Sequence, residues 1–379
     1  MSLPTHSSTV QFVKPGGPIE LREMPVPDLE PGSVLLRTLY SEVCGTDCHL
    51  LHGKLAGVPY PLTPGHVSVG EIAAMNGTVC DVDGVPFKES DQAAFLDVHE
   101  TCGECWYCTV GKVSTRCPSR KVYGITYGSD DGLLGGWSEF IYLKPGVRVL
   151  RLPENVSPLT YIAGGCGMPT AFHAVERSEI KMGDAVVVQG AGPVGLNALL
   201  FAQVSGAAKV ILTGAPRMRL DLAEQYGADE VIDVATTSPA ERIERVRELT
   251  GGRGADVTIE ACGKPAAIVE GIEMTRDAGR YLVVGQYTDN GPSQINPHLH
   301  INQKHLDIRG CWGCDVSHLY RGLAMVSRWC DHFDWEAMIT RSYGLENAAE
   351  ALDDVAALKV VKAVINPRLS TAGGRLDRS

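Results

Sequence analysis

Residues 185–206 read AVVVQGAGPVGLNALLFAQVSG, a short apolar run of β type that ends in a glycine-rich turn and leads into a helical pattern. The spacing Gly-x-Gly-x-x-Gly is a weak signal alone, because glycine-rich turns are common. Between a strand and a helix, however, it is typical of a turn that binds a dinucleotide pyrophosphate at the helix N-terminus. A purely structural turn is the alternative. The residues expected to form this cofactor site are Gly190, Gly192, Pro193, Val194 and Gly195.

Strand and helix patterns alternate on both sides of this turn. Apolar runs such as KVILTG (209–214) and RYLVVGQY (280–287) are separated by helical segments. Repeated units of this kind predict an α/β fold with a doubly wound parallel sheet, which we assign to residues 161–304. Residues 1–160 are rich in glycine, proline and short β-type runs, which favours a mostly β domain. We expect residues 305–379 to pack back onto that first domain.

A compact cysteine cluster precedes the strand–helix region. Thiolates spaced Cys-x2-Cys-x2-Cys, with a fourth cysteine nearby, suit a tetrahedral zinc ion that has no open coordination position. The alternatives are a disulfide pair or free thiols. The four residues of this expected structural zinc site are Cys102, Cys105, Cys108 and Cys117.

Bulk composition narrows the function. The chain has 379 residues, a formal net charge of −11 and 12 cysteines. An acidic surface argues against general nucleic-acid binding, which requires a basic footprint. The N-terminal residues have no apolar signal segment, and the most apolar stretch is interrupted by polar residues and glycines, so we expect no membrane span. Cysteines grouped at metal-type spacings favour a reducing cytoplasm over a disulfide scaffold.

Three further metal-type residues are scattered along the chain. Cys44 stands in CGTD, His66 in PGHVSVG and Cys166 in GGCGMPT. Two cysteines and one histidine leave a fourth position open, as a catalytic zinc ion requires. Taken singly, a cysteine is usually a small buried hydrophobic residue and a histidine a satisfied core residue. Their convergence is therefore a hypothesis.

The motifs together resemble those of the zinc-dependent medium-chain dehydrogenases, the alcohol and polyol dehydrogenase group. The resemblance rests on CGTDCH, PGHVSVGE, the cysteine cluster, GGWSEF, GGCGMPTAFHA, QGAGPVG and VVKAVINP, and it extends from about Val10 to Pro367. It implies a GroES-like, mostly β catalytic domain and a Rossmann domain that binds the nicotinamide cofactor. It also implies two zinc ions per chain, a small alcohol or carbonyl substrate, and a homodimer or homotetramer.

The resemblance assigns further roles. Thr46 would accept the alcohol proton and pass it on through the cofactor ribose, and His49 would exchange it with water. Asp47 would hydrogen-bond the ring of the histidine ligand and raise its basicity. Thr170 would touch the nicotinamide, and Lys362 would lie near the pyrophosphate. For His49, an ordinary surface histidine is the alternative.

Two departures from the family pattern carry predictions. Relatives usually read Gly-His-Glu at the second ligand, whereas this chain reads Gly65-His66-Val67. The substitution removes a negative charge from behind the metal and predicts a difference in zinc binding or exchange. The spacing from Cys108 to Cys117 is one residue longer than usual, which places Cys117 in question as the fourth ligand.

The end of the second strand of the cofactor domain bears on cofactor preference. NAD-binding proteins usually carry Asp or Glu there, to hold the ribose 2′-hydroxyl. This chain has Gly214 at that position and Arg217 three residues later. The missing carboxylate and the added cation favour NADP over NAD. An exposed arginine at a helix start is the alternative.

The leading hypothesis is a zinc-dependent oxidoreductase that transfers hydride between an alcohol and the matching ketone or aldehyde, with NAD or NADP as partner. A related reductase acting on an activated C=C bond is one alternative. A non-catalytic relative that only binds the cofactor is another.

Overall fold

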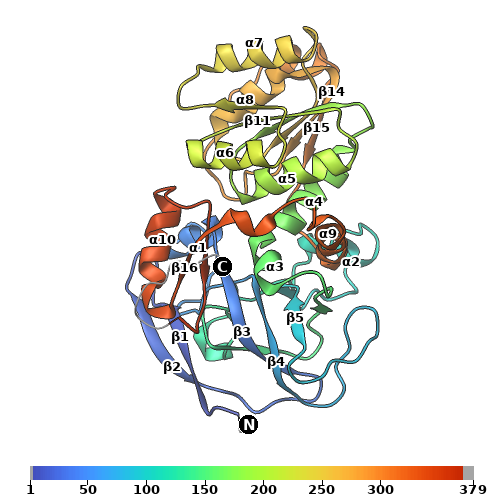
Figure 1. Cartoon of the computed structure of the whole chain (residues 1–379). Helices are drawn as coiled ribbons and strands as arrows, with labels where there is room; N and C mark the ends of the chain where they lie inside the picture. The colour runs from blue at the N-terminus through green and yellow to red at the C-terminus, as the bar shows by residue number, and fades with distance from the viewer. Residues whose placement is uncertain (1–2, 370–379) are drawn as a thin grey trace.

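A six-stranded parallel sheet forms one lobe of the molecule (Figure 1). The computed structural model describes residues 3–369 and orders these strands β12-β11-β10-β13-β14-β15. This order is that of a doubly wound fold, in which ligands bind at the carboxyl ends of the two strands where the winding reverses, here β10 and β13. The strands are β10 (Ala185–Gln189), β11 (Lys209–Gly214), β12 (Glu230–Asp233), β13 (Ala255–Glu260), β14 (Thr275–Val283) and β15 (Asp307–Gly310).

Helices cover both faces of this sheet because alternate strand residues point to opposite sides. Val187 packs with α7 on one face, whereas Val186 and Val188 pack with α5 and α6 on the other. The helices of this lobe are α4 (Gly167–Ser178), α5 (Pro193–Val204), α6 (Arg217–Gln225), α7 (Pro239–Leu249) and α8 (Pro265–Met274). The predicted doubly wound α/β architecture is confirmed.

The second lobe is built on a seven-stranded sheet of order β16-β17-β3-β4-β5-β9, in which β8 also pairs with β3. Two short ribbons, β1–β2 and β6–β7, flank it. The strands of the lobe are β1 (His6–Phe12), β2 (Ile19–Pro25), β3 (Val34–Val43), β4 (Ser68–Met75), β5 (Gln92–Phe95), β6 (Val98–His99), β7 (Lys121–Val122), β8 (Phe140–Leu143), β9 (Val149–Arg151), β16 (Ile339–Tyr343) and β17 (Lys362–Ile365).

Short helices connect and cover this second sheet. They are α1 (Gly45–Leu51), α2 (Trp106–Thr109), α3 (Pro158–Gly164) and α10 (Ala348–Ala356), with single turns at Ser114–Arg116, Ser129–Asp131, Trp335–Met338 and Leu345–Asn347. The longer helix α9 (Val316–Trp329) packs against α4, and the single turn His298–Asn302 packs against α8 in the cofactor lobe.

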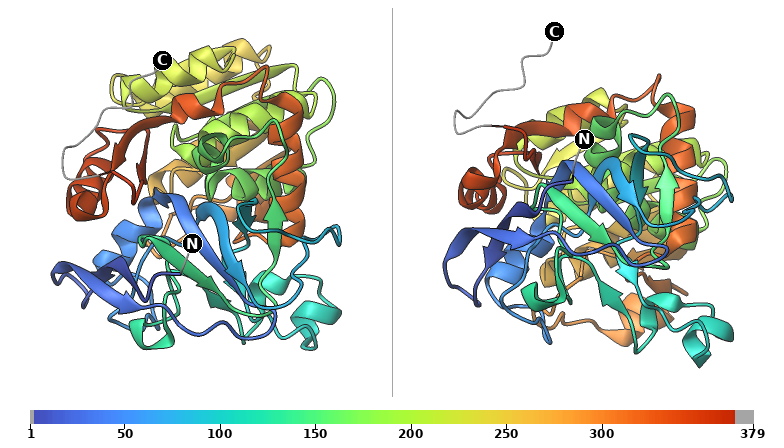
Figure 2. Two further views of the ribbon diagram at one scale, coloured as in Figure 1. Left: turned by 60° about the horizontal axis from the view of Figure 1, so that its bottom comes forward. Right: turned by 90° about the horizontal axis from the view of Figure 1, so that it is seen from below.

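The C-terminal segment returns to the N-terminal lobe. Strand β17 pairs antiparallel with β3, with Ala363 opposite Val43. Helix α10 packs against α1, and in Figures 1 and 2 these red elements lie beside the blue N-terminal ones. The parallel sheet extends past residue 304, the expected end of its domain, because β15 begins at Asp307. Residues 1–2 and 370–379 of the predicted catalytic domain lie outside the described part of the chain.

None of the helices within residues 3–369 is long and apolar enough to cross a membrane.

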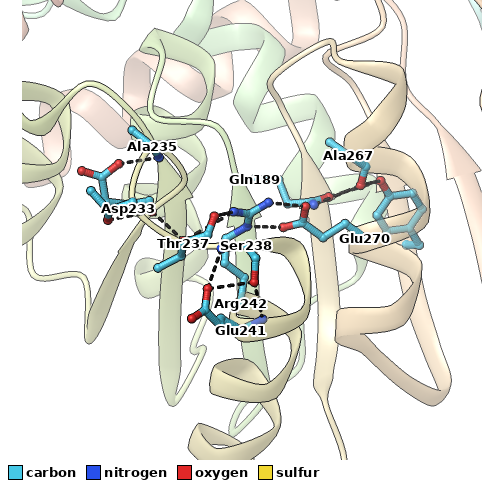
Figure 3. Close-up of polar contacts among 11 residues, drawn as sticks. Gln189, Asp233, Ala235, Thr237, Ser238, Glu241, Arg242, Ala267 and Glu270 are labelled. Atoms are coloured by element: carbon cyan, nitrogen blue, oxygen red, sulfur yellow. Dashed lines mark hydrogen bonds and ion pairs between the residues drawn. The ribbon is translucent and has the colours of Figure 1, made fainter.

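A nearly buried ion pair ties two helices of the cofactor lobe together (Figure 3). Arg242 on α7 donates from Nε and Nη2 to the two carboxylate oxygens of Glu270 on α8, both at 2.7 Å. Its Nη1 donates to the carbonyl oxygen of Thr237, just before the helix. The two side chains are 8% and 11% exposed. A guanidinium held in this two-point way fixes the spacing of α7 and α8.

The substitution Glu270→Gln tests this pair. It leaves the arginine charge nearly buried without a counter-charge, so the free energy of unfolding should fall by about 3 kcal/mol. Denaturant unfolding measures the change. Glu248→Gln is the matched control, because Glu248 pairs with Arg245 on the same helix but is 57% exposed. The control should change stability by less than about 0.5 kcal/mol. Equal effects of the two substitutions would contradict the role of burial.

Candidate active site

The four cysteines between β6 and β7 form a closed cluster. Cys105 Sγ lies 3.6 Å from Cys108 Sγ and 4.0 Å from Cys117 Sγ, and Cys117 Sγ lies 3.6 Å from Cys102 Sγ. A zinc ion with Zn–S bonds of about 2.3 Å requires sulfurs about 3.8 Å apart, and a disulfide requires about 2.0 Å. The set therefore fits tetrahedral zinc, and Cys117 takes its place despite the longer loop.

Cys44, His66 and Cys166 converge at a second cluster. Cys44 follows β3 and caps the N-terminus of α1, His66 precedes β4, and Cys166 precedes α4. One ligand atom from each residue lies within 4.8 Å of the other two. All three side chains are buried or half-buried, and Cys44 Sγ lies 4.0 Å from His66 Nε2. Two sulfurs and one imidazole nitrogen fit zinc with one position left for a substrate or water.

The electrostatics of this second cluster favour a bound cation. The hydrogen bond from Cys166 lowers the pKa of Cys44 well below its usual range, and the same bond raises the pKa of Cys166. Burial opposes the charged form of His66. The Cys44 thiolate, with Asp47 and Asp97, nevertheless raises the pKa of His66 to about 10. The pocket therefore attracts positive charge, which a metal ion supplies when it replaces the protons of its ligands.

Asp47 holds the backbone at the first ligand. Its Oδ2 accepts a hydrogen bond from the Cys44 N–H at 2.9 Å, and the Cys44 sulfur accepts one from Thr46 N–H at 3.3 Å. The predicted hydrogen bond from Asp47 to the His66 ring is not formed. Asp47 Oδ1 and His66 Nδ1 are both buried without a partner. The carboxylate therefore orients Cys44 directly and acts on His66 only through its charge.

A cavity of about 490 Å³ opens over the Cys44–His66–Cys166 cluster, between the two lobes. It brings together residues from distant segments, which is the arrangement that a two-substrate reaction needs. The predicted residues that line it are Cys44, Thr46, His49, His66, Cys166, Thr170, Pro193 and Val194.

The glycine turn has the predicted close packing. Gly190 has φ +120°, a conformation that other residues rarely adopt. A Cβ on Gly195 would collide with the carbonyl oxygen of Gly190, so the helix can approach the strand only with glycine there. Gly192 caps the N-terminus of α5, and Pro193 follows at the first helical position. The helix N-terminus thus faces the cavity with free N–H groups and a favourable dipole for phosphate.

Two predicted cofactor residues lie away from the cavity. Gly214 packs so tightly that a Cβ would come within 2.6 Å of Ala191 Cβ, so no acidic side chain fits at this position. Arg217 is 55% exposed and donates to Asp221 at 2.6 Å and Glu224 at 2.7 Å, both on its own helix.

Lys362 is placed differently from the expectation. Its side chain is fully buried, and Nζ pairs with Glu42 Oε1 at 2.7 Å instead of lining the cavity. The cation beside the glycine turn is Arg219, whose Nη1 would lie 4.0 Å from a Cβ on Gly192. Arg219 lines the cavity, and its Nε is buried without a partner. Sequence reasoning missed it because its nearness to the turn depends on how α6 packs.

Further residues line the cavity besides the predicted ones. Arg120 and Trp312 line it, and the Arg120 guanidinium carbon lies 5.3 Å from the centre of the indole ring. Tyr287 stacks on the same indole with ring centres 5.9 Å apart. These aromatic residues come from the segments that follow β14 and β15, so the cofactor lobe supplies part of the cavity lining. No motif in the sequence marks Arg120 or Tyr287. Trp312 lies within Cys311-Trp-Gly-Cys314, a spacing of redox type for which pocket lining or core is the favoured interpretation, and this segment lines the cavity.

The fold and the two sites define a zinc-dependent dehydrogenase that uses a nicotinamide cofactor. Residues 30–154 match the alcohol dehydrogenase GroES-like domain, and residues 193–328 match the zinc-binding dehydrogenase family. The chain belongs to the zinc-binding medium-chain alcohol and polyol dehydrogenase family. It is an NAD(P)-linked enzyme of that group.

Individual relatives match along nearly the whole chain. A 5-exo-hydroxycamphor dehydrogenase of Pseudomonas putida is 33% identical over 93% of this chain and 96% of its own length. An L-threonine 3-dehydrogenase of Pyrococcus horikoshii is 30% identical over 94% and 97%. The crystal structure of an alcohol dehydrogenase from Thermotoga maritima superposes with a TM-score of 0.91 at 33% identity, over 96% of this chain and all of that one.

Metal counting separates the two clusters. We expect about two zinc ions per wild-type chain, and about one in either Cys166→Ala or Cys105→Ala, because each substitution removes a ligand from a different site. Elemental analysis measures the content. Cys330→Ala is the control, since this half-buried thiol belongs to neither cluster, and it should keep both ions. A wild-type protein with one zinc ion, lost only with Cys105, would show that the Cys44–His66–Cys166 cluster holds none.

Proposed function

We propose that this enzyme transfers hydride between an alcohol carbon and the nicotinamide of NADP or NAD at the Cys44–His66–Cys166 cluster. The observation that carries the proposal is that one cavity is lined both by these three residues and by the start of α5, which follows the glycine turn. When bound, zinc supplies the Lewis acidity that favours the deprotonated form of an alcohol. The chain's own residues orient the substrate and move its proton.

Proton transfer falls to Thr46 and His49 in this proposal. Both line the cavity from α1, the helix that begins directly after Cys44. The Thr46 hydroxyl accepts the alcohol proton as it releases its own along the relay. His49 takes up the relayed proton and passes it to solvent at the half-exposed end of the helix. Burial, with a smaller contribution from Lys54, lowers the pKa of His49. The ring is therefore neutral at physiological pH and ready to accept a proton.

The pH profile of alcohol oxidation tests this relay. His49 accepts a proton only when neutral, so oxidation should fall as the pH drops through its pKa, below the ordinary value of 6.5. His49→Gln should lower kcat on the order of 10- to 100-fold and abolish that limb of the profile. His52→Gln is the control, because the His52 ring bonds the Cys48 carbonyl outside the cavity. An unchanged profile in His49→Gln would contradict the relay.

The same assays separate the alternative reactions. Turnover of secondary or primary alcohols, lost in Cys166→Ala, supports alcohol chemistry. Reduction of an activated C=C bond without alcohol turnover would support a related reductase instead. Cofactor binding without either reaction would support a non-catalytic relative.

For the cofactor, we infer a preference for NADP. No carboxylate fits at Gly214 to repel a 2′-phosphate, and Arg217 stands at the start of the helix that follows β11. Its ion pairs with Asp221 and Glu224 are exposed, so they contribute little and yield to a phosphate. Arg219 beside Gly192 is proposed to neutralise the phosphates that both cofactors share.

Substitution of Arg217 tests the preference. Arg217→Gln should lower kcat/KM for NADP about tenfold and leave that for NAD nearly unchanged, because only the 2′-phosphate loses a charged partner. Arg245→Gln is the matched control, since Arg245 is also exposed and paired with two carboxylates, but on α7. Steady-state kinetics with both cofactors measures the ratio. An unchanged ratio in Arg217→Gln would contradict the inferred preference.

Assembly and location complete the proposal. We propose a homodimer or homotetramer, supported by β15, an edge strand of the parallel sheet on which Ile308 is 39% exposed. Ile295 and Leu299, in the segment before this strand, are also exposed. A cytoplasmic location is supported by the cysteines, all of which are free thiols in the structure, with six gathered into the two metal clusters. We also propose that residues 1–160 and 305–379 form the catalytic domain and that residues 161–304 form the cofactor domain, to whose sheet β15 adds one strand.

A further inference from the structure

We infer that Glu42 and Lys362 form a positioning pair that holds Cys166 in place for metal binding. This inference rests on the proposed function of the Cys44–His66–Cys166 cluster. Glu42 Oε1 lies 2.7 Å from Lys362 Nζ, and the side chains are 1% and 0% exposed. Lys362 is among the largest fully buried side chains of the molecule. Two opposite charges buried this completely are costly unless they are paired and hydrogen-bonded.

The remaining polar contacts of the pair go to the segment that carries Cys166. Glu42 Oε2 accepts a hydrogen bond from the Cys166 N–H at 2.6 Å, and Lys362 Nζ donates to the Ile162 carbonyl oxygen at 3.3 Å. Gly165 lies between them with φ +51°, and a Cβ there would collide with both Glu42 Oε2 and Lys362 Nζ. The ion pair therefore contacts the backbone at two points near the junction of α3 and α4, the Ile162 carbonyl and the Cys166 N–H.

The pair is also anchored beside the other two ligands. Glu42 lies two residues before Cys44 on β3, and its N–H donates to the Val67 carbonyl oxygen at 3.0 Å. Ser41 pairs with Ser68 in the β3–β4 ladder, so Glu42 faces Val67, the residue that follows His66. Facing residues of an antiparallel pair lie on one side of the sheet. The carboxylate missing from position 67 is thus present on the neighbouring strand.

The consequence is mechanical as well as electrostatic. Cys166 directly precedes α4, whereas Cys44 follows β3 and His66 precedes β4, and the Glu42 side chain links the two regions through the Cys166 N–H. A charged acceptor gives the strongest such contact, because hydrogen bonds to ionised groups are shorter and stronger than neutral ones. Contacts of this kind around a metal ligand typically change metal affinity by about 10- to 100-fold.

Two variants separate positioning from general stability. Glu42→Gln keeps an oxygen for the Cys166 N–H but leaves the Lys362 charge buried and unpaired. The double variant Glu42→Leu/Lys362→Met removes both charges and also removes the acceptor. Replacement of a whole buried ion pair by apolar residues is often neutral for stability, whereas loss of one partner is strongly destabilising. We therefore expect the double variant to be more stable than Glu42→Gln. We also expect the double variant to retain zinc less well than Glu42→Gln.

The experiment follows zinc loss to a coloured chelator from the intact protein, together with denaturant unfolding. Cys166→Ala identifies the kinetic phase of the Cys44–His66–Cys166 cluster, and the four-cysteine site is the internal reference. We expect this phase to be about tenfold faster in the double variant and unchanged at the reference site. Glu270→Gln, which breaks a nearly buried pair in the cofactor lobe, should lower stability without changing either phase.

Three results would overturn the inference. In the first, the double variant folds and keeps its zinc as tightly as wild type. In the second, the order of Glu42→Gln and the double variant is the same in stability as in zinc retention. In the third, Glu270→Gln speeds zinc loss as much as the double variant does. Failure of the proposed function gives a different result, because wild type would then lack the phase assigned by Cys166→Ala.

Discussion

Strand β3 is the element on which the rest of the structure depends. It pairs with β4, β8 and β17, so its backbone is held on both edges along most of its length. Glu42 lies near its end, and Cys44 follows it directly. A slip of one residue between β3 and β4, or between β3 and β17, would turn every side chain of the slipped strand to the opposite face of the sheet. The registers of β4 and β17 against β3 therefore decide whether a metal site exists.

The two metal clusters are built in different ways, and this difference accounts for their different chemistry. Four cysteines from one loop close around an ion by local folding, and they stabilise a segment whose Trp106 and Tyr107 remain exposed. The other three ligands come from separate elements and leave one position open. Such a site forms only when the lobe has folded, and it then faces the cavity beside the cofactor turn.

Close packing at the end of β11 excludes a charged side chain from that position of the cofactor domain. Gly214 lies against Ala191 too closely for a side chain, so the end of β11 carries no acid to recognise a ribose. In the proposed cofactor site, recognition of the phosphates falls to Arg217 and Arg219 on α6 and to the N-terminus of α5. Arg217 reaches out to solvent and Arg219 is buried beside the turn, although they are only two residues apart. Helical geometry places them on different faces.

The sequence by itself determined the features that depend on short stretches of chain. These are the doubly wound parallel sheet, the glycine turn, the four-cysteine cluster and the family resemblance. Only the tertiary structure decided the long-range partners. Lys362 pairs with Glu42, and Arg219 lies beside the glycine turn. The Asp47 carboxylate accepts a hydrogen bond from the Cys44 N–H and none from the His66 ring. The physical reason is that periodicity and spacing specify local conformation, whereas contacts between distant residues follow from strand register and packing.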